Sequence, residues 1–200
     1  MPHRGDNTLF DCPRLRTRYG AAPMVMPPRS ASDSPLFSAV QETFSRMNWQ
    51  CRRVENREVL EADFEVYHTR TRIHAQVFAP LNAVSIVGTL GHKVPDSRSG
   101  TVGEMLMRTN KELTIGNFEL DHDTGTVLFR ATNIFPVEKV DGNIIASLVH
   151  TALAEVDRLT PFLTLVLRME QRELAALNLK TFLMREDLLP PVPDEDAPAP

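Results

Sequence analysis

Two histidines are the first residues whose spacing suggests chemistry. His68 and His74 flank a turn at residues 68–71, so their imidazoles could approach each other across a hairpin. With Asp63 or Glu65 nearby they could hold a metal ion, but the spacing supplies no third ligand. Exposed hairpin histidines explain the pattern more simply, and we expect neither a metal nor another cofactor.

Three carboxylates are a second candidate for chemistry. Glu61, Asp63 and Glu65 alternate along one segment, which places neighbouring side chains roughly 7 Å apart on one face of a strand. A general acid/base pair is conceivable, but the solvated face of an amphipathic sheet is the simpler interpretation. Nearby arginines could pair with these acids across strands, or form a small basic patch for an acidic or nucleic partner: Arg52, Arg53, Arg57, Arg70 and Arg72.

Nucleophilic and phosphate-binding motifs are missing from the sequence. It has no GxSxG, and neither Cys12 nor Cys51 has a histidine beside it. The glycines at 88–91 and 100–103 match neither a phosphate loop nor a dinucleotide fingerprint. Two distant cysteines form neither a disulfide framework nor a zinc motif. We therefore predict no catalytic residue and no enzyme activity.

Composition indicates one globular domain with tails. The chain has 200 residues, of which 42% are hydrophobic, and a net charge of -4. No apolar run reaches the length of a membrane span, and no secretory signal is recognised at the N-terminus, so a cytoplasmic location is expected. Residues 1–34 are rich in Pro and Arg and are expected to be disordered, and residues 190–200 form a Pro/acid tail. Nucleic-acid binding is not expected, because the central part is nearly neutral.

Hydrophobic periodicity predicts the elements of the first half. Residues 35–49 follow helical spacing, with Ser34 as N-cap and Pro35 in the first turn. Alternation then predicts strands near 60–67, 73–77 and 83–90. A second helix follows Pro95, where Thr101 and Glu104 fit a capping box.

The second half is predicted to hold a hairpin and helices. Strands near 115–120 and 126–131 flank a turn that contains Gly125. An apolar helix at 144–156 is capped by Asp141 or Asn143, and Thr160 with Pro161 interrupts it and starts another helix that ends before Pro190. The order α-β-β-β-α-β-β-α favours an α+β fold, in which helices pack on an antiparallel sheet of about five strands.

The stretch from Asn110 to Asp121, with the sequence NKELTIGNFELD, resembles a motif of the YbjN family of bacterial sensory transduction regulators. Trp49 and the Val94-Pro95 step also resemble the family pattern, and the similarity covers approximately residues 36–168. The resemblance implies a fold like that of type III secretion chaperones, often dimeric, which hold a partner polypeptide without catalysis. It implies no catalytic residue or ligand.

The chain is therefore divided into an N-terminal tail (1–34), a YbjN-like α+β domain (35–168), a C-terminal helical extension (169–189) and an acidic tail (190–200). Apolar residues after Pro161 are more numerous than a compact core needs, and they could pack within the chain, exchange with a second subunit or cover a groove. The predicted function is a homodimeric, chaperone-like or regulatory adaptor that binds a client or regulator protein. A small-molecule-sensing domain is the alternative. The predicted partner-binding residues are Phe162, Leu163, Val166, Leu167, Leu174 and Leu177.

Overall fold

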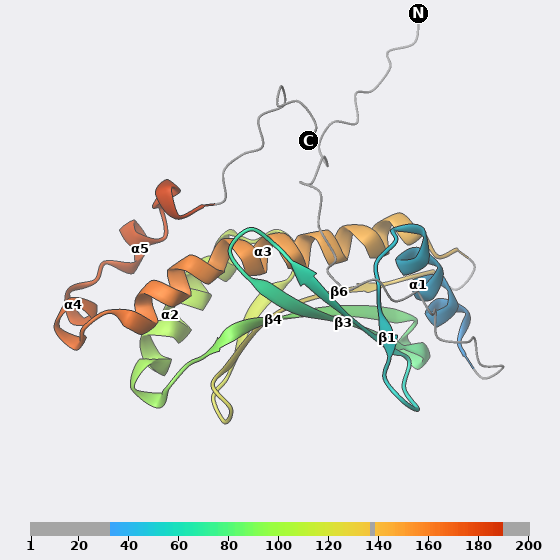
Figure 1. The fold of residues 1–200 in the computed structure, drawn as a ribbon, viewed down its shortest axis with the longest axis horizontal. Helices are drawn as coiled ribbons and strands as arrows, with labels where there is room; N and C mark the ends of the chain where they lie inside the picture. The colour runs from blue at the N-terminus through green and yellow to red at the C-terminus, as the bar shows by residue number, and fades with distance from the viewer. Residues whose placement is uncertain (1–32, 137–138, 190–200) are drawn as a thin grey trace, which may run out of the picture.

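The computed structural model describes residues 33–136 and 139–189, so most of both predicted tails lies outside the described residues. One antiparallel sheet carries its helices on one face, and α3 runs along that face with α1 near one end and α2 toward the other (Figure 1). The sheet order is β1-β2-β3-β4-β6-β5. The α+β fold class is confirmed, with a sixth, two-residue strand added at the edge. The bounds are α1 Pro35–Arg46, β1 Arg52–Arg53, β2 Val59–Glu65, β3 Arg70–Phe78, β4 Ala83–Lys93, α2 Asp96–Glu112, β5 Asn117–Asp121, β6 Thr126–Ile134 and α3 Gly142–Arg168, followed by the short α4 Gln171–Ala176, α5 Leu179–Phe182 and 3-10 turn Glu186–Leu188.

Several local predictions are confirmed. The Ser34 hydroxyl accepts a hydrogen bond from the backbone N–H of Phe37 at the start of α1, and Asp141 caps α3 through the N–H of Asn143. Gly125 has a φ of +65°, and an added Cβ would lie 2.3 Å from the carbonyl oxygen of Val94. The β5–β6 turn therefore requires glycine for both its conformation and its space.

The predicted break at Pro161 is wrong, because α3 continues through it to Arg168. Proline removes one helical hydrogen bond, at a cost of about 3 kcal/mol in a helix interior. Fully buried neighbours such as Phe162 and Leu163 each contribute about 1.5–3 kcal/mol when removed from water, so burial on both sides of Pro161 outweighs that cost. Thr160 is not an N-cap; its hydroxyl donates to the Val156 carbonyl within the same helix.

The predicted start of the second helix also needs correction. Helix α2 begins at Asp96, with Pro95 in the cap position and no side-chain capping bond. Glu104 does not form a capping box with Thr101; it pairs with Arg108 one turn later, at 2.7 Å. Gly100 and Gly103 lie within this helix, whose side chains Val102 and Met105 are buried in the core.

Packing of α3 on the sheet centres on Gly88 of β4. An added Cβ there would lie 3.0 Å from Cγ2 of Val156 and 3.1 Å from Cδ1 of Ile73. The missing side chain therefore lets the helix approach the strand closely. The interior of the molecule lies between α3 and the inner face of the sheet, where Ile86 and Phe129 are fully buried.

A buried carboxylate ties the β2–β3 turn to α3. Asp157, which is only 5% exposed, accepts a hydrogen bond of 2.6 Å from the backbone N–H of His68. Nδ1 of His68 lies 3.4 Å from the same carboxylate, close enough for an ion pair when the imidazole is protonated. The turn between two strands is thus anchored by one helix side chain.

Replacing this anchor should loosen the hairpin. Asp157→Ala leaves the His68 N–H without its partner, so we expect the free energy of unfolding to fall by about 1–3 kcal/mol in urea denaturation. Glu155→Ala is the matched control, because it removes only a partly exposed pair with Arg158 within the same helix and should cost about 0.5 kcal/mol. Equal losses in the two variants would contradict the anchoring role.

Candidate functional site

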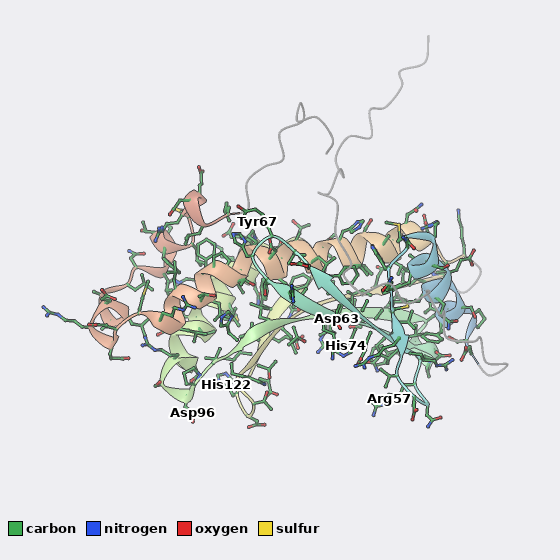
Figure 2. The ribbon with its side chains drawn as sticks, viewed as in Figure 1. Arg57, Asp63, Tyr67, His74, Asp96 and His122 are labelled. Carbon is green, nitrogen blue, oxygen red and sulfur yellow. The ribbon has the colours of Figure 1, made fainter. Side chains whose placement is uncertain are left out.

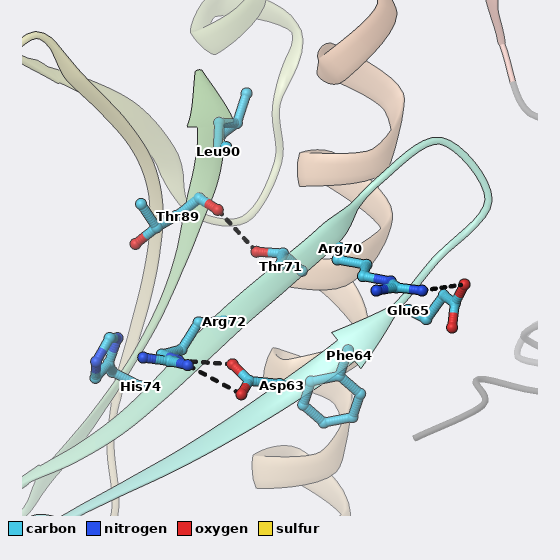
Figure 3. Close-up of a pocket in the computed structure, with 10 residues that line it drawn as sticks. Asp63, Phe64, Glu65, Arg70, Thr71, Arg72, His74, Thr89 and Leu90 are labelled. Atoms are coloured by element: carbon cyan, nitrogen blue, oxygen red, sulfur yellow. Dashed lines mark hydrogen bonds and ion pairs between the residues drawn. The ribbon is translucent and has the colours of Figure 1, made fainter. Parts of the chain in front are cut away.

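The face of the sheet without helices carries the charged side chains that alternate along β2 and β3. Asp63 pairs with Arg72 at 2.6 Å, and Glu65 pairs with Arg70 at 3.5 Å (Figure 3). Both pairs line a hollow of about 700 Å³ that opens on this face between β2, β3 and β4. The prediction that arginines pair with these acids across neighbouring strands is confirmed for Arg52, Arg70 and Arg72. Arg53 instead pairs with Asp33, at 2.7 Å.

Glu61 lies in the same row, between two partners. Its carboxylate is 2.6 Å from Arg52 and 2.9 Å from Nε2 of His74. Burial acts to raise the pKa of Glu61, but the hydrogen bonds from Arg52 and His74 outweigh it, and the pKa is lowered. Toward the opposite edge of the same face, the hydrogen bond from Arg130 lowers the pKa of Glu119. These acids are held ionised, as members of matched pairs.

The two histidines are not brought together. Figure 2 shows Tyr67, next to His68, beside α3 at the tip of the hairpin, and His74 on the side of the sheet away from that helix. His68 contacts Asp157, whereas His74 contacts Glu61. Among residues 33–136 and 139–189, no three side chains of the metal-binding types converge.

His150 and Cys51 lie near the Trp49 side of the core. The His150 ring packs edge-on against Trp49 at a centroid distance of 5.3 Å, and burial lowers its pKa. Burial also raises the pKa of the Cys51 thiol to about 11, so the thiol stays protonated at neutral pH and is a poor nucleophile. Cys12 lies outside the described residues.

The motif at 110–121 builds a protected sheet edge. Asn110 at the end of α2 accepts a 2.7 Å hydrogen bond from the Phe118 N–H and donates one of 3.0 Å to the Phe118 carbonyl. The amide side chain thus takes the place of a neighbouring strand. Gly116 has a φ of +76°, and an added Cβ would lie 2.4 Å from the Phe129 ring. Within the motif, Asn110 therefore bonds the backbone of β5, and Gly116 allows the chain to approach Phe129 closely.

A second hollow, of about 500 Å³, lies beside this motif. It is bounded by the loop before β5, by the end of β6 and by the first turns of α3. Sequence reasoning missed it, because residues distant in the chain form it and the register of the strands determines where it opens. The lining residues are Thr114, Ile115, Gly116, Thr132, Asn133, Asn143, Ile144, Ser147, Leu148 and Thr151.

Large apolar side chains are exposed around the second hollow. Ile115 is 51% exposed and Ile144 is 42% exposed, and both line it. Ile134, at the end of β6 next to the lining residue Asn133, is 71% exposed. Phe78 lies in the same row of the sheet as Ile134, with Ala83 of β4 between them. We call Phe78, Ile115, Ile134 and Ile144 the apolar end of the sheet.

The predicted partner-binding residues lie against the core of their own chain. Phe162, Leu163, Val166 and Leu174 are buried, and Leu167 and Leu177 are partly buried. The Phe162 ring packs edge-on against Phe182 of α5, with centroids 5.4 Å apart. Contact with a partner therefore stays a prediction, and it requires the C-terminal extension to leave this position.

Within the described residues, no helix combines the length and apolar character needed to cross a membrane. No curated protein matches the chain. Among solved structures, YbjN from E. coli, described as a putative transcription regulator, has a TM-score of 0.46 at 11% identity, with 66% of this chain and 90% of that chain covered. A chain of the HopA1-SchA chaperone-effector complex has a TM-score of 0.41 at 11% identity, covering 60% of this chain and 89% of that one.

The family comparison covers the sheet together with α1, α2 and most of α3. Residues 37–164 match the model of the YbjN family, whose description is "Putative bacterial sensory transduction regulator". The matched range includes the Asn110–Asp121 motif, Trp49 and the Val94-Pro95 step, on which the resemblance rests. Because the match extends over well more than half of the chain, the chain belongs to the YbjN family.

Proposed function

We propose that this chain is a cytoplasmic, non-enzymatic domain that binds another protein, as a chaperone-like or regulatory adaptor, and that it works as a homodimer. The observation that carries the first part is the apolar end of the sheet. Large exposed apolar side chains that gather in one place mark interaction surfaces more often than chance exposure does. Here two of them, Ile115 and Ile144, line the second hollow, whereas the charged side chains of the open face are matched in pairs.

The paired charges support binding of protein in preference to a charged small molecule. A charged ligand that displaces one member of an ion pair such as Asp63–Arg72 leaves the other member unpaired. The apolar end requires no such exchange, because burying Ile134 or Ile144 removes apolar surface from water without separating charges.

The C-terminal extension supports the homodimer. Every hydrogen bond and ion pair of residues 170–189 joins two residues of that same segment, within the described part of the chain. The buried side chains of Leu174, Leu179 and Phe182 join the core, and Phe182 packs against Phe162 of α3. The Arg98 side chain of α2 also donates a hydrogen bond to the carbonyl of Met169, where the extension begins. The same contacts can form on the α3 of a second copy, which is the geometry of an exchanged dimer.

A photo-crosslinking residue tests the protein-binding surface. Placed at Ile134 in the full chain and irradiated in a bacterial extract, it should form adducts with another polypeptide. The same residue at Glu104, which is exposed on α2, is the control and should form few. Equal labelling from both positions, or none from position 134, would argue against a partner at the apolar end.

Sedimentation velocity tests the exchanged dimer. The wild-type chain should sediment as a dimer in the micromolar range, and Phe182→Asp should shift it toward monomer because a charge cannot pack against Phe162. Met184→Asp, at an exposed position of the same segment, should leave the dimer intact. A wild-type monomer throughout this range would remove the homodimer from the proposal.

The hollow beside Asp63 and Arg72 favours a second candidate, a small-molecule-sensing regulatory domain. A thermal-shift screen of metabolites on the full chain separates the two, because a ligand that binds only the native state raises its melting temperature. A shift abolished by Arg72→Ala would favour sensing at this hollow. No shift across the screen would leave protein binding as the supported function.

A further inference from the structure

Strand β6 extends beyond its neighbour β5. The pairing of β5 with β6 stops at Asn117 opposite Arg130, whereas the pairing of β4 with β6 continues to Ala83 opposite Ile134. Among the described residues, 131–134 therefore have a neighbouring strand on one side only. The chain leaves this edge at Gly116, whose left-handed conformation turns it away from β6. The second hollow opens at the point where β5 would otherwise have continued.

The alternation of an antiparallel ladder fixes which backbone groups point to the open side. Asn110 bonds both the N–H and the C=O of Phe118, so these two groups point away from β6. The residues on either side, Asn117 and Glu119, then face β6 opposite Arg130 and Leu128. Because the direction alternates along a strand, the N–H and C=O groups of Thr132 and Ile134 point to the open side. Within the described part of the chain, no hydrogen bond to these four groups is found.

The chemistry of the hollow restricts what can lie there. None of its ten lining residues is charged. The sides are formed by hydroxyl and amide groups, such as those of Thr151 and Asn143, and by apolar groups, such as those of Ile115 and Leu148. A charged side chain would lose water without finding a partner of opposite sign. An aliphatic side chain would meet Ile115, Ile144 and Leu148.

We propose that β6 and the second hollow form a strand-addition site, in which an extended, uncharged segment of a partner polypeptide pairs with Thr132 and Ile134 and inserts an aliphatic side chain toward α3. The proposal deepens the proposed function, on which it rests, by naming the surface and the form of the partner. Main-chain hydrogen bonds supply affinity in this mode, and the pocket for alternate side chains supplies selectivity.

The other sheet edges do not offer the same site. Strand β1 has only two residues, both arginines, and a short, charged edge resists pairing. At β5, Asn110 already occupies the edge groups of Phe118. The end of β6 has neither a short, charged strand nor a side chain that bonds its edge groups. Pro136 follows Ile134 two residues later, so an added strand can pair over a short segment only.

Phage display of random twelve-residue peptides on the full-length chain provides the probe. Selection should enrich uncharged peptides rich in Val, Ile and Thr. Ser147→Lys places a charge in the hollow from an exposed position of α3, and it should weaken a selected peptide by about tenfold or more in Kd. Ala154→Lys, exposed on the same helix outside the hollow, should leave the Kd unchanged. N-methylation of alternate peptide residues should also weaken binding, because it removes edge hydrogen bonds.

Three results would overturn the strand-addition site. One is selection of charged peptides only, or of none; another is equal binding by the wild-type and Ser147→Lys chains. The third is self-association that Ser147→Lys abolishes, which would assign the edge to a second copy of this chain. If crosslinks from position 134 persist in any of these cases, the proposed protein-binding function stands while this mode of binding fails.

Discussion

The close packing of α3 on the sheet is the constraint on which the rest of the structure depends. Gly88 allows the helix to approach β4 with Val156 directly above it, and the burial of one long apolar face drives the two layers together. On the same packed helix, Asp157 reaches the His68 backbone, and burial of Phe162 and Leu163 keeps α3 helical through Pro161. In its first turns, Ile144 and Ser147 line the second hollow beside the end of β6.

A sheet covered by helices on one face leaves its other face and its two edges exposed. On the open face, opposite charges are matched in pairs such as Arg130–Glu119, and an exposed pair of this type contributes little stability. On β5, the side chain of Asn110 already bonds the edge groups of Phe118. The unpaired end of β6 differs from both, since apolar side chains and free backbone groups meet there. Protein binding is proposed at the end of β6 because its edge groups have neither a matched charge pair nor a bonding side chain such as Asn110 beside them.

Much of the fold could be predicted because the signals are local. Ser34 with Pro35, the alternation around Phe64 and the turn at Gly125 depend on residues close in sequence, and each has one favoured conformation. Pro161 misled the prediction because its local cost is outweighed by tertiary burial of Phe162 and Leu163. A backbone hydrogen bond by the Asn110 side chain could be predicted from sequence. That this bond protects the edge of the sheet could not, because it depends on where β5 lies. The second hollow depends on the offset between β5 and β6, which no short pattern encodes.

Amide hydrogen exchange in the full-length chain tests most directly whether the end of β6 is an open edge. Along this strand, the Ala131 and Asn133 amides face β4 and should exchange slowly, whereas those of Thr132 and Ile134 face solvent and should exchange rapidly. Binding of an extended peptide should slow the exchange of the Thr132 and Ile134 amides and leave the exchange of the Ala131 and Asn133 amides unchanged. Slow exchange of all four amides in the isolated monomer would mean that the edge is already paired, and the account of a free binding edge would be wrong.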